Sequence, residues 1–255
     1  MYNYLLHLRT YLIIKRKQLS NAVSRQKGRG YTPFAILCEP RTGSTLLHTY
    51  LNFHPQVMSY GEVLREKRVA GLYTSPQPVS AYVFKPHSPQ IKAVGLKLFY
   101  SYLQDPFYQS AFDEVMQRKD VRIIHLVRKD LLKQYVSLEI AKKTKVWSAD
   151  RAHVKPEREK MHIDCEDLTR FLDLYMQNQN YLKGLFQQHE VLSIAYEGLS
   201  ERPSEVLEEV QRFLGVQPRT LLSLLQKQSS RPLESFITNY DEARRTVEKV
   251  LNGSL

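Results

Sequence analysis

Four short apolar runs recur along the chain, separated by longer segments of helical period, and this alternation is the feature that most constrains the fold. The runs lie at residues 33–38, 93–99, 121–127 and 191–195. Apolar runs of this length are typical of strands that are buried on both faces. Strands that alternate with helices predict a central parallel sheet flanked by helices, which is an α/β fold.

The intervening segments carry recognisable helix signals. A helix is expected from Ser44 to Leu51, before the break at His54–Pro55, and another from Asp130 to about Thr144. Leucine and aromatic residues at helical spacing predict a long helix over 167–188. A fourth helix is expected over 203–214, where Gly215 is placed to end it. Residues 65–92 are rich in proline and predict loops with at most one short helix.

The first 30 residues are interpreted as a basic amphipathic extension and residues 31–255 as one domain. No apolar run approaches the roughly 18 residues that a membrane-spanning helix needs. The extension has two interpretations. It is a candidate for peripheral membrane contact, with Lys15, Arg16 and Lys17 facing lipid head groups and an inserted apolar set of Leu5, Leu6, Tyr11, Leu12 and Ile13. The favoured alternative is a first helix packed on the domain, because apolar stripes usually face a core.

The net charge indicates which kinds of partner the chain can bind, and the cysteine content indicates the cellular compartment. The chain has 37 Lys and Arg against 26 Asp and Glu, a net charge of +11. This balance favours anionic partners such as nucleotide phosphates, nucleic acid or acidic lipid. Cys38 and Cys165 are far apart and form no CxxC pair, so neither a disulfide framework nor a zinc site is indicated. A reducing cytoplasm is the expected location.

The loop after the first apolar run has the features of an anion-binding site. Free backbone N–H groups converge at the start of the following helix, where the helix dipole adds positive charge. Gly43 permits a tight turn, and Arg41 can donate two hydrogen bonds to one phosphate or sulfate group. Ser44 and Thr45 add hydroxyl donors. The competing interpretation is that Ser44 simply caps the helix.

The loop does not match the nucleotide-hydrolysing pattern G-x-x-x-x-G-K-[ST], because Cys38 and Ser44 replace the first glycine and the lysine. It resembles the sulfotransferase family, whose 5′-phosphosulfate loop reads P-[KR]-[ST]-G-[ST]-[ST] and is matched throughout residues 40–45. The resemblance implies a P-loop-like nucleotide-binding fold and 3′-phosphoadenosine 5′-phosphosulfate as donor, with no metal. It assigns donor contacts to Arg41, Thr42, Gly43, Ser44 and Thr45.

Two later segments extend the resemblance. Arg128 and Ser137 form the Arg-x8-Ser pattern by which sulfotransferases bind the nucleotide's 3′-phosphate. A surface ion pair with Asp130 is the alternative for the arginine. Tyr196 opens a YE-x-L segment that is similar to the family's and is assigned to nucleotide binding. The family's RKG-type loop is not evident, and residues 227–231 are the candidate substitute.

The residues after the first helix suggest the catalytic groups. The segment from His54–Pro55 to Gly61–Glu62 resembles the HP…GE segment of the carbohydrate and tyrosyl-protein sulfotransferases. The chain is also identified as similar to the bacterial Nod-factor-type sulfotransferases. The resemblance of the HP…GE segment implies that Glu62 is the general base, with an exposed helix-cap glutamate as the alternative. Arg41 and Lys97 are assigned to charge stabilisation, although a strand lysine can equally be an exposed edge residue. His54 is expected to fix a turn, His48 to serve in packing or capping on the first helix, and His125 to lie in the core.

The sequence therefore predicts a sulfotransferase that acts on a hydroxyl group of a carbohydrate or glycolipid, with the segment 73–89 as a candidate acceptor cleft. Two other classes stay open. A kinase-like phosphotransferase is disfavoured by the missing loop lysine and by the lack of a DxD-type magnesium cluster. A non-catalytic nucleic-acid-binding protein is compatible with the charge, but the basic residues are dispersed and no RNP-like motif is found.

Overall fold

The computed structural model describes residues 12, 15–64, 78–147, 160–223, 225 and 231–253. The chain forms two compact units, the first within residues 1–127 and 188–224 and the second within 128–187 and 225–255. Among the described residues, no helix combines the length and the apolar character that crossing a bilayer requires.

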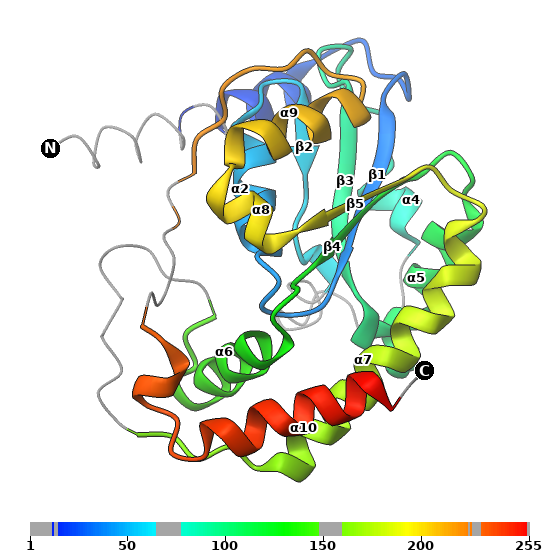
Figure 1. Ribbon diagram of the computed structural model, residues 1–255. Coiled ribbons are helices and arrows are strands. Elements are labelled where there is room, and N and C mark those ends of the chain that lie inside the picture. Colours follow the sequence, from blue (N-terminus) through cyan, green and yellow to red (C-terminus); the bar gives the residue numbers. More distant parts are fainter. Residues whose placement is uncertain are drawn as a thin grey trace, which may run out of the picture. The chain divides into compact units, whose positions relative to one another are not determined.

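The first unit is built on a five-stranded parallel sheet with the order β2-β3-β1-β4-β5 (Figure 1). The predicted α/β fold with a parallel sheet is confirmed. The strands are β1 (Thr32–Cys38), β2 (Val57–Ser59), β3 (Ala93–Phe99), β4 (Arg122–Val127) and β5 (Val191–Ala195). All four expected apolar runs are strands, whereas the three-residue β2 was not expected.

The strand order makes β1 the point at which the chain changes direction across the sheet. From β1 the chain passes to β2 and β3 on one side, and then to β4 and β5 on the other. Ligands of open parallel sheets bind at the carboxyl ends of the strands beside such a point. The packing around β1 is tight, because a Cβ atom at Gly95 of β3 would lie 2.3 Å from the carbonyl oxygen of Phe34.

The helices of the first unit include α2 (Ser44–Phe53), α4 (Val79–Tyr82), η1 (Tyr100–Gln104), α5 (Pro106–Gln117), α8 (Tyr196–Glu201) and α9 (Pro203–Phe213). Of these, α2, α4 and α9 were expected from the sequence, whereas η1, α5 and α8 were not. The helix expected over 44–51 extends two residues further, to Phe53. Gly215, at a φ of 70°, follows the end of α9 as predicted. The short helix anticipated within 65–92 is α4, whereas residues 65–77 lie outside the described part of the chain.

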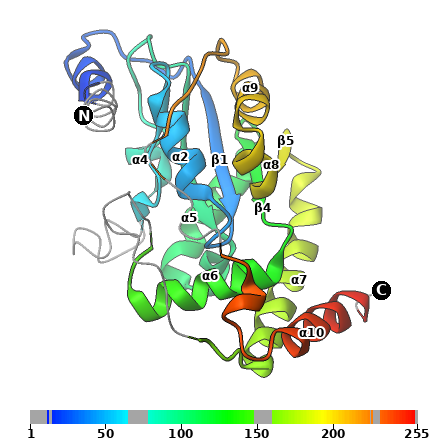
Figure 2. The ribbon, with the colours of Figure 1, turned by 60° about the vertical axis from the view of Figure 1, so that its left-hand side comes forward.

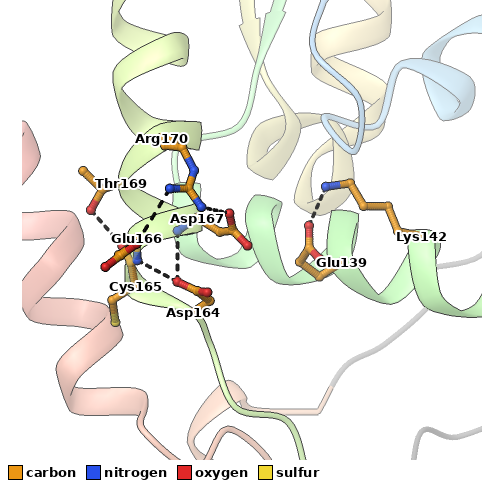
Figure 3. Close-up of polar contacts among 8 residues, drawn as sticks. All are labelled: Glu139, Lys142, Asp164, Cys165, Glu166, Asp167, Thr169 and Arg170. Atoms are coloured by element: carbon orange, nitrogen blue, oxygen red, sulfur yellow. Dashed lines mark hydrogen bonds and ion pairs between the residues drawn. The ribbon is translucent and has the colours of Figure 1, made fainter.

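The second unit consists of α6 (Leu131–Thr144), α7 (Cys165–Phe186), η2 (Leu233–Ser235) and α10 (Tyr240–Asn252). Its core includes Leu132, Leu172 and Phe236. The start of α7 is capped by the carboxylate of Asp164, which accepts hydrogen bonds from the backbone N–H groups of Glu166 at 2.9 Å and Asp167 at 3.1 Å (Figure 3). Both predicted long helices are therefore present, each shifted by one or two residues at its start.

The N-terminal helix comprises residues 15–23 and differs from the sequence expectations in two respects. Lys17 is only 6% exposed, and its Nζ donates to the backbone oxygen of Asn52 at 2.9 Å and to its side-chain oxygen at 3.2 Å. The expectation that Lys17 faces lipid head groups is therefore wrong. The helix does pack on the domain, but through polar side chains, and Leu12 is 55% exposed. Four other residues of the apolar set, Leu5, Leu6, Tyr11 and Ile13, lie outside the described residues.

Candidate active site

The loop between β1 and α2 has an unusual backbone. Arg41 has a φ of 67° and Gly43 a φ of 83°, so both residues adopt the left-handed conformation. For Arg41 this conformation is strained, and such strain is often found at ligand-binding loops. The hydroxyl group of Thr42 donates to the backbone oxygen of Glu39 at 2.8 Å and closes the loop. The loop therefore has a fixed shape directly before the helix N-terminus.

Gly43, not Ser44, occupies the N-cap position of α2, and no side chain forms a capping hydrogen bond there. The interpretation of Ser44 as a simple cap is therefore wrong. Ser44 is the first helical residue and is 4% exposed. The ten-residue helix directs its free N–H groups and its dipole toward the loop. The neighbouring Cys38 is buried, and burial raises the pKa of its thiol to about 12, so it is not a nucleophile at neutral pH.

The aromatic ring of Tyr196 lies directly against Gly43. A Cβ atom at Gly43 would lie 2.4 Å from Cδ2 of that ring, which is closer than any real contact. Tyr196 follows β5 as the first residue of α8. The structure thus brings together two predicted donor-binding residues that are far apart in the sequence.

Glu62, Lys97 and Thr45 form a second group. Lys97 Nζ lies 2.7 Å from Oε1 of Glu62 and donates to the Thr45 hydroxyl at 3.2 Å. Lys97 is 3% exposed, so the interpretation of this residue as an exposed edge lysine is wrong. The side chain of Glu62 is 21% exposed. Two predicted catalytic residues and one residue of the predicted donor loop therefore share one charged cluster.

Backbone pairing positions this cluster. In β3, Lys97 pairs with Ile36 of the central strand β1. The backbone N–H of Lys97 also donates to the carbonyl oxygen of Gly61 at 2.9 Å. This bond continues the β2–β3 pairing beyond Ser59 and brings the next residue, Glu62, beside Lys97. Thr45 reaches the same place from the first turn of α2.

A buried polar network supports β2 from the α2 side. The Nδ1 atom of His48 lies 2.7 Å from the Ser59 hydroxyl, and Asn52 donates to the backbone oxygen of Ser59 at 2.8 Å. The His48 ring also lies against Gly61, where a Cβ atom would be 3.1 Å from it. Burial lowers the pKa of His48 to about 4, so the ring is neutral at physiological pH. Sequence reasoning assigned His48 to packing or capping and gave Asn52 no role; their four-residue spacing on one helix face was the available signal.

Two histidines have the structural roles that the sequence predicted. His54 accepts a hydrogen bond at Nδ1 from the backbone N–H of Gln56 at 3.1 Å, and Nε2 lies 3.1 Å from the backbone oxygen of Gln217. Both ring nitrogens are therefore used to fix the turn. His125 is buried in β4, where burial lowers its pKa to about 4.

The remaining predicted donor residues belong to the second unit. Arg128 directly follows the last residue of β4, and Ser137 lies about two turns into α6. Asp130 caps α6 by accepting a hydrogen bond from the backbone N–H of Lys133 at 2.9 Å, and it forms an ion pair with the Lys133 side chain at 3.1 Å. Most of the candidate RKG-loop substitute, residues 227–230, lies outside the described residues.

The strand, the candidate anion-binding loop and the helix that follows it can be compared with known proteins. The family model of the Stf0 sulphotransferases matches residues 97–243, more than half of the chain. The chain belongs to this family. The expected membership of the sulfotransferases, with a resemblance to the Nod-factor-type enzymes, is confirmed, and the protein is a sulfotransferase.

Full-length relatives agree with this assignment. Nodulation protein H of Rhizobium meliloti strain 1021 is 28% identical over 229 residues, which cover 83% of this chain and 90% of the relative. Nodulation protein H of Rhizobium tropici is also 28% identical, with 84% and 88% covered.

A solved structure of low sequence identity shows the same fold. Mouse sulfotransferase SULT7A1, complexed with PAP, aligns with a TM-score of 0.50 and 14% identity over 88% of this chain and 83% of its own. A sulfotransferase from Alicyclobacillus acidocaldarius aligns with a TM-score of 0.46 and 13% identity, over 86% of this chain and 95% of its own. The alignment with the mouse sulfotransferase confirms the P-loop-like sulfotransferase fold that the loop predicted.

Proposed function

We propose that this sulfotransferase transfers a sulfuryl group from 3′-phosphoadenosine 5′-phosphosulfate to a hydroxyl group of a carbohydrate or glycolipid, with Glu62 as the general base. The observation that carries the proposal is the contact of Lys97 with both Glu62 and Thr45. It joins a carboxylate that can accept a proton, an ammonium group that can stabilise negative charge, and the first turn of the helix that follows the anion-binding loop.

In the proposed reaction, Glu62 removes the proton from the acceptor hydroxyl group while the oxygen attacks sulfur. The bond from sulfur to the bridging oxygen of the 5′-phosphate breaks, and adenosine 3′,5′-bisphosphate leaves with the electron pair. Lys97 and Arg41 stabilise the negative charge that shifts toward the departing phosphate and the sulfuryl oxygens. The proton held by Glu62 returns to solvent after product release. No redox step is involved.

The donor is assigned to three parts of the chain. The 5′-phosphosulfate would bind the Arg41–Thr45 loop, whose left-handed residues and helix N-terminus suit an anion. The 3′-phosphate would bind Arg128 and Ser137, as the family pattern implies. The Tyr196 ring packs against Gly43 and would hold the backbone of the loop in place for contact with the phosphate. The solved relative in complex with PAP supports a nucleotide of this kind.

The acceptor class is inferred from the HP…GE segment and from the relatives. That segment resembles the one in carbohydrate sulfotransferases, and the curated relatives that span this chain are nodulation proteins H. A hydroxyl group on a sugar, with or without a lipid attached, is the acceptor that these similarities favour. The segment 73–89 remains a candidate for shaping the acceptor site; of it, residues 78–89 are described, and α4 begins there.

Two measurements test the proposal. Calorimetric titration should show binding of adenosine 3′,5′-bisphosphate that ATP does not match at equal concentration. Incubation with donor carrying radioactive sulfur and an extract of the protein's own cells should then label a product that is sensitive to glycosidase treatment. A labelled protein or a labelled small phenol would contradict the acceptor class. A preference for ATP would contradict the donor.

A further inference from the structure

The N-terminal helix presents an apolar face to solvent. Leu12, Leu19 and Val23 are 55%, 64% and 68% exposed. They account for three of the six large apolar side chains that are exposed in the described part of the chain. Leu19 and Val23 are four residues apart and therefore share one face of the helix, since a helix repeats every 3.6 residues. The helix is drawn in dark blue in Figure 2.

The opposite side of the same helix holds it on the first unit through polar contacts. Lys17 donates to Asn52, as described above, and four residues later the side chain of Asn21 accepts a hydrogen bond from the backbone N–H of Ser88 at 2.8 Å. Ser20 lies between them and donates to Gln90 at 3.2 Å. An ordinary surface helix buries its apolar face and exposes its polar face. This helix does the reverse, so its apolar stripe is directed outward by specific contacts.

Exposed basic side chains lie in this helix and directly after it. Arg16 is exposed within the helix, and Arg25, Lys27 and Arg29 are exposed in the segment that follows it. The net charge of the chain is +11. An exposed apolar stripe flanked by arginine and lysine is the pattern of helices that lie in the plane of a membrane interface. Anionic lipid head groups attract such basic clusters.

We propose that the outward face of this helix docks onto a lipid bilayer that contains anionic lipids. Leu12, Leu19 and Val23 would enter the boundary between head groups and acyl chains, and the exposed arginines would contact the head groups. A second copy of the chain fits less well, because pairing these faces would bring two basic clusters together. This inference is independent of the acceptor and of the catalytic residues.

Docking in this way leaves the candidate active site accessible. The helix contacts the end of α2 and, through Lys17, the backbone oxygen of Val57 at the start of β2. The anion-binding loop instead follows the end of β1 and precedes α2. In a parallel sheet all strands start on one side of the sheet and end on the opposite side. The helix therefore lies near the amino ends of the strands, whereas the loop lies at their carboxyl ends.

Vesicle flotation with the full chain tests the proposal. We expect the protein to float with vesicles of phosphatidylcholine and phosphatidylserine, and to float much less with pure phosphatidylcholine or at high salt. Leu19→Ser together with Val23→Ser should reduce the partition coefficient about tenfold or more, because two apolar side chains no longer insert. The matched control is Val146→Ser with Tyr181→Ser, which removes two apolar side chains that are 37% and 52% exposed elsewhere. It should float like the wild type.

Thermal unfolding and enzyme activity serve as controls. Thermal unfolding should be unchanged in both double variants, because all four side chains are exposed. Sulfuryl transfer to a water-soluble acceptor should be unchanged in the variant that carries Leu19→Ser and Val23→Ser. Arg25→Gln with Arg29→Gln should weaken binding to anionic vesicles only. Equal flotation of the wild type and the Leu19 and Val23 variant would overturn the proposal. So would a wild-type dimer in sedimentation velocity that the same variant converts to a monomer, with no vesicle binding by either.

Discussion

Lys97 Nζ lies 2.7 Å from the carboxylate of Glu62, and this ion pair joins strand β3 to the segment that follows β2. Lys97 is 3% exposed, so its charge would be costly without a partner. Glu62 therefore has a structural role in addition to its proposed role as base. A variant at Glu62 has to preserve the contact if it is to report on catalysis alone.

Glu62→Gln satisfies that requirement. The amide oxygen can still accept a hydrogen bond from Lys97, but glutamine cannot take up the acceptor's proton. We expect turnover to fall by roughly 10²- to 10⁴-fold, with little change in affinity for adenosine 3′,5′-bisphosphate. Steady-state kinetics and calorimetry measure the two effects. A purified Gln variant that keeps more than about a tenth of wild-type turnover would fall short of a general-base loss and would remove Glu62 from that role.

Gly43 should tolerate no side chain, for two separate reasons. Its φ is 83°, and a Cβ atom would lie 2.4 Å from the Tyr196 ring. Gly43→Ala should therefore lower the stability of the protein by about 1 to 3 kcal/mol and abolish measurable binding of adenosine 3′,5′-bisphosphate, and Gly43→Val should be more severe.

The control for this glycine is Gly184 in α7, where a Cβ atom would meet nothing within 4 Å. Gly184→Ala should raise stability by about 0.5 to 1 kcal/mol, because alanine favours the helix, and should leave nucleotide binding intact. Denaturant unfolding and calorimetry compare the two. Normal nucleotide binding by Gly43→Ala would contradict a close approach of the loop to a phosphate.

Arg41 is proposed to contact the group that is transferred. Arg41→Lys keeps the positive charge, but one ammonium group cannot copy the two parallel donors of a guanidinium group. We expect nearly normal affinity for adenosine 3′,5′-bisphosphate and a slower turnover. Single-turnover kinetics with saturating donor measure the chemical step directly. If that step keeps its wild-type rate in the lysine variant, two-point contact by Arg41 is unnecessary.

The sequence predicted those parts of the fold that depend on neighbouring residues. The bounds of β3 and β5 agree with their apolar runs. Strand β3 is buried on both faces, which leaves a continuous apolar signal, whereas β5 is an edge strand and is mostly half-buried. The strand β2 has only three residues and was missed, since no periodicity can be recognised over that length. The pairing of β2 with β3 nevertheless places Glu62 beside Lys97. The partners of Glu62 were therefore unavailable from sequence, although its place after His54–Pro55 was visible.

The orientation of the N-terminal helix shows a second limit. Its amphipathic pattern indicated two faces, and either could have been directed inward. Which face is directed inward depends on the carbonyl oxygens of Asn52 and Val57, which accept hydrogen bonds from Lys17. No pattern in the neighbouring sequence reveals these acceptors. Composition favoured burial of the apolar face, and the tertiary hydrogen bonds reversed it.

Arg128 and Ser137 are proposed to bind the 3′-phosphate of the donor. Arg128→Ala and Ser137→Ala should each weaken binding of adenosine 3′,5′-bisphosphate by about 1 to 3 kcal/mol, the usual value of a hydrogen bond to a charged group. Binding of adenosine 5′-phosphosulfate, which lacks the 3′-phosphate, should change far less and serves as the internal control. Equal losses for both nucleotides in calorimetry would show that these residues do not recognise the 3′-phosphate.

Lys17 should make stability depend on pH. Burial lowers its pKa from the ordinary value of 10.5 to about 7 in the folded protein. Between these two values the unfolded chain binds the extra proton, so the free energy of unfolding should rise as pH increases from 7 to 10.5. Below pH 7 the ammonium group is present in both states, and its full burial cost applies. Above 10.5 it is neutral in both states, and that cost is absent.

Lys17→Met separates this titration from the other contributions of the residue. The variant leaves the carbonyl oxygens of Asn52 and Val57 without their donor, and this loss alone contributes about 1 to 3 kcal/mol of destabilisation that does not depend on pH. It should also remove the rise between pH 7 and 10.5, so the difference in unfolding free energy between wild type and variant should change across that window. Urea unfolding at a series of pH values measures the difference, in which all other titrations cancel. A difference that stays constant throughout the window would show that Lys17 keeps its ordinary pKa in the folded protein.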